Sequence, residues 1–163
     1  MRNLTFIVPF AVTAALAGAA LAEPASVNVT VGAQLQDKVE ELGPREVREQ
    51  SDRLVQLVTQ AVAETPALNG ARIDLVLTDL KPNRPTFQQI SERPGLDPMR
   101  SISIGGAEIE GQITLADGTV QPVRYEWFSN TLADVRGFTT WQDADRAFRR
   151  FSSNLATGRY VNR

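Results

Sequence analysis

The chain has 163 residues, with 17 basic and 19 acidic side chains and a formal net charge of −2 at pH 7. It contains no cysteine and no histidine, which excludes disulfide bonds, thiol nucleophiles, Ser-His-Asp triads and nearly all zinc sites. A mildly acidic chain has no bulk attraction for nucleic acid, so we expect no nucleic-acid partner. Neither a calcium-loop pattern nor a glycine-rich phosphate loop is present, so we expect no metal and no cofactor.

Residues 1–22 have the pattern of an export signal. Arg2 precedes an uncharged, apolar stretch over residues 4–21, and Ala20-Leu21-Ala22 is a small-x-small cleavage site. The alternative is a membrane anchor, because this stretch is nearly as long as a bilayer span requires. No cluster of basic residues follows it, which favours cleavage after Ala22. We therefore expect a periplasmic or secreted protein without stable membrane insertion, and a single domain over residues 23–163.

The first elements of that domain are predicted from periodicity. Residues 26–31 alternate apolar and polar side chains, which predicts a half-buried strand. Residues 33–42 suggest a short helix or helical turn, which Gly43-Pro44 ends. Over residues 45–64 the apolar side chains form one stripe above a charged face, which predicts an amphipathic helix.

Residues 71–80 are predicted to form a central strand. Val76 and Leu80 fall on the face opposite Ile73 and Leu77, so we expect both faces of this strand to be partly covered. Residues 81–100 then hold four of the nine prolines, and we expect no regular element there. A structureless connection of this length is uncommon in a compact domain and is either functional or mobile.

The next stretch, residues 101–115, is predicted to be a strand. Ile102 and Ile104 are out of phase with the apolar residues that follow, and we expect a β-bulge at Gly105-Gly106 to correct the phase. Asp117-Gly118 predicts a hairpin turn of type I′. The returning strand is expected over residues 119–128.

The last element is predicted to be an amphipathic helix from Thr140 to about Gly158. Thr140 and Asp143 resemble a capping box, and aromatic residues recur at helical spacing after it. The resulting order is β-α-β-β-β-α. It predicts an α+β fold, a two-layer sandwich with a mixed four-stranded sheet and two main helices on one face.

This layout resembles that of certain secreted bacterial domains of unknown function. The resemblance rests on the order strand, helix, strand, proline-rich loop, hairpin and aromatic helix, and on the segment over residues 73–80 with its Leu-Thr-Asp-Leu ending. It implies the α+β sandwich and a location in the cell envelope. It implies no catalytic residues.

Four residues are candidates for binding a ligand or a partner. Asp79 stands at the end of the predicted central strand, and strand ends that lead into long loops often carry sites. Arg84, Arg93 and Arg100 belong to the proline-rich loop, where guanidinium groups can receive a carboxylate or a phosphate. The alternatives are that Asp79 caps a turn and that the three arginines are solvated surface charges.

Carboxylates are the strongest acid/base candidates in a chain without histidine or cysteine. Glu108 and Glu110 share one face of a predicted strand, where two close carboxylates could divide the roles of acid and base. The simpler interpretation is an exposed sheet face. We therefore expect a non-enzymatic envelope domain that binds a protein partner or a small ligand. A carboxylate-dependent enzyme, such as a hydrolase, and a carrier of apolar ligands are the alternatives.

Overall fold

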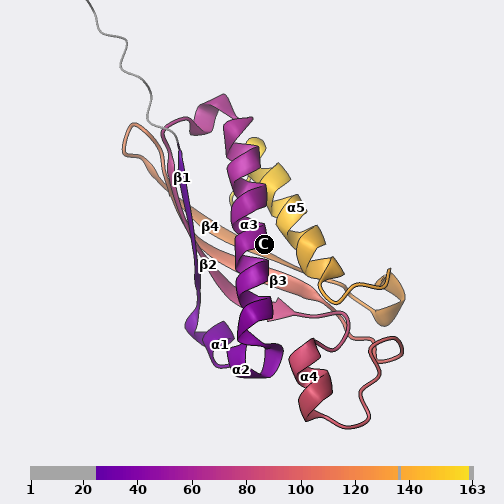
Figure 1. Cartoon of the computed structure of the whole chain (residues 1–163). Coiled ribbons are helices and arrows are strands. Elements are labelled where there is room, and N and C mark those ends of the chain that lie inside the picture. Colours follow the sequence, from indigo (N-terminus) through magenta and orange to yellow (C-terminus); the bar gives the residue numbers. More distant parts are fainter. Residues whose placement is uncertain (1–24, 136, 162–163) are drawn as a thin grey trace, which may run out of the picture.

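The computed structural model describes residues 25–135 and 137–161 (Figure 1). The predicted export signal, residues 1–22, lies outside the described residues. Within the described part of the chain, no helix is long and apolar enough to cross a membrane.

Four strands form one mixed sheet in the order β1-β2-β3-β4. β1 (Ser26–Val31) and β2 (Arg72–Lys81) are parallel, and the long helix α3 (Pro44–Ala63) lies in the connection between them. β3 (Gly106–Thr114) is antiparallel to β2, and β4 (Val120–Phe128) is antiparallel to β3. The predicted α+β fold with a mixed four-stranded sheet is thus confirmed.

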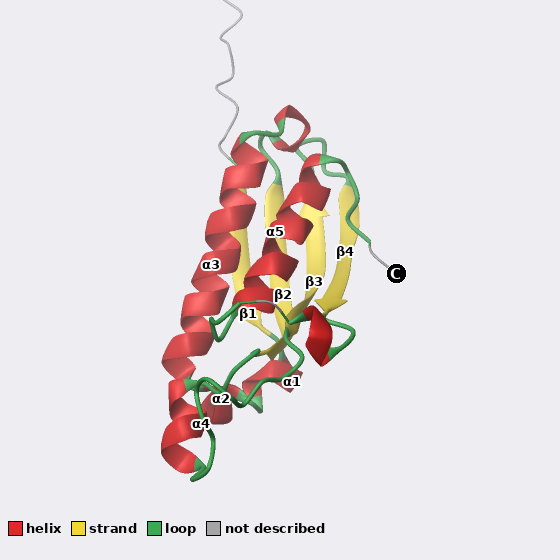
Figure 2. Cartoon of the chain, turned by 90° about the vertical axis from the view of Figure 1, so that its right-hand side faces the viewer, coloured by secondary structure: helices red, strands yellow, loops and turns green. Residues whose placement is uncertain are grey.

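Both long helices cover the same face of this sheet. α3 and α5 (Gln142–Ala156) run side by side across it, as Figure 2 shows. Phe148 and Phe151 of α5 are fully buried between the layers, and the Phe151 ring lies 5.5 Å from the ring of Tyr125 on β4. The core therefore forms where the apolar stripes of the helices meet the alternate apolar positions of the strands.

A β-bulge in β2 changes the face on which Leu80 lies. Pairing with β3 shifts register between Leu77 and Asp79, so Thr78 is the extra residue of β2. The extra residue reverses the alternation, and Leu80 becomes buried in the core with Leu77. The prediction that Leu80 lies opposite Leu77 is therefore wrong, and Val76 keeps its place on the other face.

β3 begins at Gly106, which is later than predicted. Ile102 and Ile104 are outside the sheet and partly exposed, so the expected bulge at Gly105-Gly106 is wrong. Gly106 has φ +152°, and a Cβ there would collide with the carbonyl oxygen of Trp127 on β4. The glycine is needed for the close approach of two strands.

The hairpin lies where it was predicted, but its turn is of another type. The N–H of Gly118 donates to the Leu115 carbonyl over 2.9 Å, and the N–H of Leu115 donates to the Thr119 carbonyl over 2.8 Å. Only glycines have positive φ among the described residues, so Asp117 does not. The connection is therefore a three-residue loop, in which a type I turn is followed by a glycine in the left-handed conformation. A type I′ turn is excluded.

Short helices occupy the connections. The predicted helical region over residues 33–42 forms α1 (Ala33–Gln36) and α2 (Val39–Leu42), and the single turns η1 (Pro66–Leu68) and η2 (Leu132–Asp134) follow later in the chain. The expectation that the proline-rich loop contains no regular element is wrong, because it contains α4 (Phe87–Glu92), which lies next to α2. A capping box between Thr86 and Gln89 begins this helix.

Candidate functional site

The proline-rich loop lies at the end of the sheet where β2 and β4 finish. We call this region the loop end and define it as two segments: residues 82–105, and the described residues 129–135 and 137–141. Lys81, the last residue of β2, is opposite Gly106, which in turn is opposite Phe128, the last residue of β4. Two segments far apart in sequence therefore leave the sheet side by side.

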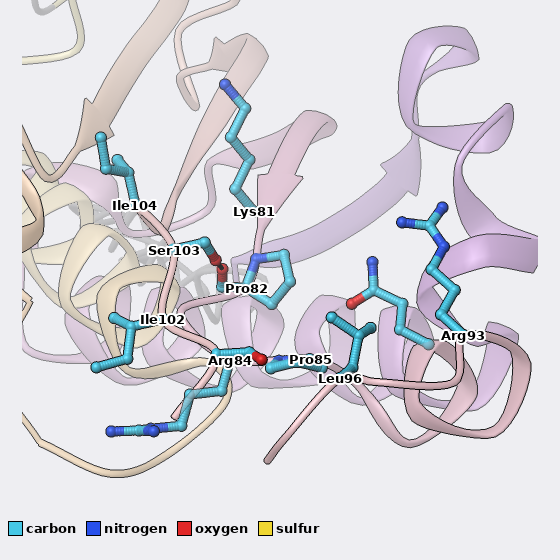
Figure 3. Close-up of a pocket in the computed structure, with 11 residues that line it drawn as sticks. Lys81, Pro82, Arg84, Pro85, Arg93, Leu96, Ile102, Ser103 and Ile104 are labelled. Carbon is cyan, nitrogen blue, oxygen red and sulfur yellow. Dashed lines mark hydrogen bonds between the residues drawn. The ribbon is translucent and has the colours of Figure 1, made fainter. Parts of the chain in front are cut away.

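A cavity of about 380 Å³ opens within the first of these segments, and we call it the loop cavity (Figure 3). Its walls are mostly apolar, and every ionisable side chain that lines it is a cation. The lining residues are Lys81, Pro82, Arg84, Pro85, Gln89, Arg93, Leu96, Ser101, Ile102, Ser103 and Ile104. The loop that was predicted from the sequence to carry a site therefore contains a cavity, and that it binds a ligand stays a prediction.

Arg84 lines the loop cavity but uses its guanidinium group to hold the loop end together. It is only 5% exposed, and it donates to the backbone carbonyls of Met99 and of Gly137, the latter over 3.3 Å. Its guanidinium carbon also lies 5.6 Å from the centre of the Phe138 ring. Arg84 therefore joins the two segments of the loop end. The interpretation of Arg84 as a solvated surface charge is wrong.

Arg93 is exposed at the opposite side of the same cavity. Its Nη2 donates to Oε1 of Glu41 on α2 over 2.9 Å, and Gln89 donates to the same oxygen over 3.1 Å. This ion pair fastens α4 to α2. A single nitrogen of the Arg93 fork makes this bond, so the other donors of the guanidinium group are not used in the ion pair.

Asp79 adjoins the loop cavity through Lys81. Its Oδ1 accepts hydrogen bonds from Lys38 over 2.8 Å and from the N–H of Leu80 over 2.9 Å, and its Oδ2 lies 3.4 Å from Lys81 Nζ. Burial raises the pKa of Asp79, but Lys38, Lys81 and the Leu80 N–H outweigh burial and hold this pKa below its usual value. Asp79 is thus an ionised carboxylate between two lysines, and it is not part of the cavity lining.

Arg100, like Asp79, does not line the cavity. It is exposed, and its backbone N–H donates to Oδ1 of Asp97 over 2.8 Å. The structure therefore brings Arg84 and Arg93 to one cavity, places Asp79 beside it and leaves Arg100 on the surface turn next to it.

Glu108 and Glu110 lie on the face of the sheet opposite the helices, as the alternation predicted. Glu110 forms an ion pair with Arg124 of β4 over 2.8 Å, and Glu108 is opposite Glu126 in the register of β3 and β4. Neither glutamate belongs to the loop cavity.

A buried polar cluster at the loop end was not predicted from the sequence. Asp143 is fully buried, and its Oδ2 accepts hydrogen bonds from Ser129 and from Asn83 Nδ2, the latter over 2.6 Å. Its Oδ1 accepts one from Arg146 over 3.1 Å. The predicted capping box of Thr140 and Asp143 is therefore wrong, because Asp143 binds other segments and α5 has no side-chain cap.

Asn83 connects this cluster to the beginning and the end of the proline-rich loop. Its side-chain oxygen accepts from the Asp143 N–H over 2.8 Å, its backbone N–H donates to Thr140 over 2.7 Å and its carbonyl accepts from Ser103 over 2.9 Å. A Cβ at Gly105 would lie 2.6 Å from the Asn83 side chain, so the glycine leaves room for it. Asn83 thereby fixes the start of the loop, its end and the start of α5.

Exposed apolar side chains gather at the loop end. Among the described residues, Phe87, Met99, Ile102, Ile104, Leu132 and Phe138 are large, apolar and exposed, and all six belong to its two segments. The Met99 carbonyl and the Phe138 ring contact Arg84, and Ile102 and Ile104 line the cavity that Arg84 also lines; we call these four residues the apolar patch. Val120 and Val161, the other exposed large apolar residues in the described ranges, belong to neither segment.

A second cavity, of about 400 Å³, separates Phe87 from Trp141. Glu46 of α3 binds both sides of it, because it accepts from the Trp141 indole N–H over 2.8 Å and from the Phe87 backbone N–H over 2.9 Å.

The described residues contain no group of three or more acidic side chains placed to hold a metal ion.

No protein-family model matches this chain, and no curated protein and no solved structure is found to be similar to it. The function must therefore be argued from the geometry of the loop end.

Proposed function

We propose that the protein is exported to the cell envelope and is a non-enzymatic domain that binds a protein partner through the apolar patch of the loop end. The observation that supports this proposal is that four exposed apolar residues, Met99, Ile102, Ile104 and Phe138, belong to segments that meet at one buried arginine. Contiguous exposed apolar surface is costly in water, and it commonly marks an interaction site.

The apolar patch also rests on a well-fixed base. Arg84 holds the Met99 and Gly137 carbonyls, and Asn83 joins the loop to α5. A surface that is already ordered loses little conformational entropy on binding, which favours affinity. Asp79 and Glu110, two of the carboxylates on which the hydrolase alternative depends, are each bound in an ion pair. This argues against the hydrolase alternative.

The export part of the proposal is tested by the intact mass of the protein recovered from the envelope fraction. Cleavage after Ala22 is expected, because the small-x-small site precedes Glu23-Pro24. A full-length mass in an integral membrane fraction would contradict export as a soluble protein.

The binding part is tested by site-specific photo-crosslinking in living cells. A photoreactive amino acid replaces Met99 or Phe138 of the apolar patch, and Val120 of the distant hairpin is the matched control. Met99 and Val120 are similarly exposed, at 60% and 54%. We expect the Met99 and Phe138 positions to form an adduct of the same mass, and Val120 to form none.

Two outcomes would refute the binding proposal. One is the absence of any adduct at both Met99 and Phe138. The other is a set of adducts at Val120 that matches theirs, because this would show only non-specific apolar contact.

A further inference from the structure

We infer that the loop cavity binds an extended peptide segment of the partner in which a carboxylate neighbours a large apolar side chain. This inference rests on the proposed function and names the chemistry that the partner presents. The apolar side chain enters the cavity, and the carboxylate lies beside Lys81 and Arg93.

The charges of the lining support an anionic ligand. Lys81, Arg84 and Arg93 are the ionisable side chains of the lining, and all three are cations. Lys81 is paired with Asp79 and Arg93 with Glu41, and neither carboxylate belongs to the cavity lining. The cavity therefore attracts negative charge and repels positive charge.

Two of these cations are exposed at the cavity. Figure 3 shows the side chains of Lys81 and Arg93 both extending upward in this view, with their charged ends well apart, whereas Arg84 extends to the lower left. Lys81 Nζ is 3.4 Å from Asp79, a longer separation than the 2.8 Å between Lys38 and the same carboxylate. The side chains of Lys81 and Arg93 are about half exposed, at 51% and 57%. Lys81 Nζ also lies 4.4 Å from the centre of the Phe128 ring, so a ligand carboxylate competes with this ring and Asp79 for Lys81, and with Glu41 for Arg93.

The apolar walls support a ligand with an apolar side chain beside its charge. Pro82, Pro85, Leu96, Ile102 and Ile104 are the apolar residues of the lining, and Ile102 and Ile104 also belong to the apolar patch. A volume of about 380 Å³ is near the lower limit of ligand sites, which suits a short extended segment. The cavity is thus continuous with the surface that we propose contacts the partner.

The test measures the affinity of two short peptides for the purified protein. The probe is acetyl-Leu-Asp-Leu-amide, and its neutral counterpart is acetyl-Leu-Asn-Leu-amide, which has nearly the same shape. Methyl resonances of Ile102 and Ile104 report occupancy of the cavity by NMR. We expect the aspartate peptide to shift these resonances and to bind about tenfold more tightly than the asparagine peptide.

Two double variants with equal net charge test the role of the cations. Lys81→Gln with Arg93→Gln removes the two exposed cations of the cavity and keeps Arg84. Lys38→Gln with Arg149→Gln is the control, because Lys38 shares the partner Asp79 and Arg149 has 59% exposure and a comparable ion pair, 2.7 Å from Asp145. We expect the first double variant to weaken the aspartate peptide about tenfold and the control to change its affinity less than about twofold.

Three results would overturn the inference: equal affinity of the two peptides, equal loss in the two double variants, or binding of octanoate without binding of the aspartate peptide. The last result would assign the cavity to a free apolar acid. If the peptide fails while crosslinking at Met99 and Phe138 persists, the proposed function stands and only the ligand class is refuted. If both fail, both are refuted.

Discussion

At Asp143, a carboxylate without exposed surface accepts hydrogen bonds from three side chains that belong to three parts of the chain. Asn83 follows β2, Ser129 follows β4 and Arg146 lies on α5. Local sequence suggested a capping role, because Asp143 stands three residues after Thr140. The helical spacing indicates a buried position, because Asp143 is one turn before Ala147 and two turns before Phe151, on the buried stripe of α5.

Replacing Asp143 is expected to destabilise the fold strongly. Asp143→Ala leaves Asn83 and Ser129 without their acceptor in a buried environment, and we expect a loss of about 3 kcal/mol in the free energy of unfolding. Asp145→Ala is the control. Asp145 binds Arg53 and Arg149 but is one-third exposed, so its loss should cost less than about 1 kcal/mol. Urea unfolding measures both values, and equal losses would contradict the structural role of Asp143.

The two lysines beside Asp79 are expected to control its pKa unequally. Burial raises this pKa and the lysines lower it, with Lys38 the stronger influence because its Nζ is 2.8 Å away. Lys38→Gln should therefore raise the Asp79 pKa, and Lys81→Gln should raise it less. Carbon NMR titration of the side-chain carboxyl group measures the shift, and a larger rise in the Lys81 variant would refute this order.

The same shift has a consequence for stability. Because the folded-state pKa of Asp79 lies below the value of about 3.9 for an unfolded aspartate, its ionised form stabilises the fold above pH 3.9. This contribution is lost as the pH falls through the lowered folded-state pKa. In Lys38→Gln the contribution at neutral pH is smaller, so the stability of that variant should depend less on pH in this acidic range.

At the scale of the elements, regular periodicity predicted β1, α3, β4 and α5, because each has one buried face and an unbroken alternation or stripe. The errors occurred where tertiary contacts change the pattern. Nothing in the local sequence marks Thr78 as the extra residue of a β-bulge. The bulge was expected at Gly105-Gly106, but Gly106 allows two strands to approach closely. α4 was missed because prolines flank it, although Thr86 and Gln89 form a recognisable capping box.

The two layers are expected to depend on the aromatic stripe of α5. Phe148 is fully buried, so Phe148→Ala should cost about 3–5 kcal/mol through lost apolar contact and the cavity left behind. Phe138→Ala is the matched control with the same chemical change, and its ring is 76% exposed. It should cost less than about 0.5 kcal/mol. Guanidinium unfolding measures the free energy of unfolding of both variants. A similar loss in the two would show that the Phe148 ring is not part of the core.

At the scale of the whole molecule, the sequence predicted the two layers, the connection order and the proline-rich loop as the place to look for function. It did not predict how the loop is fixed, because Arg84 and Asn83 act through partners 53 and 60 residues away. Nor could it predict that the Met99 carbonyl and the Phe138 ring both contact Arg84, since these two residues come from different loops. Local patterns determine elements, whereas a surface made by two loops requires their packing.

The most direct test of the central claim is the affinity of the crosslinked partner for the protein with Met99→Ser and Phe138→Ser together. Both side chains are exposed, so the thermal midpoint should stay unchanged. The dissociation constant should rise by about a hundredfold, because two apolar contacts at the centre of the interface are lost. An unchanged dissociation constant with an unchanged midpoint would show that the loop end is not the binding surface.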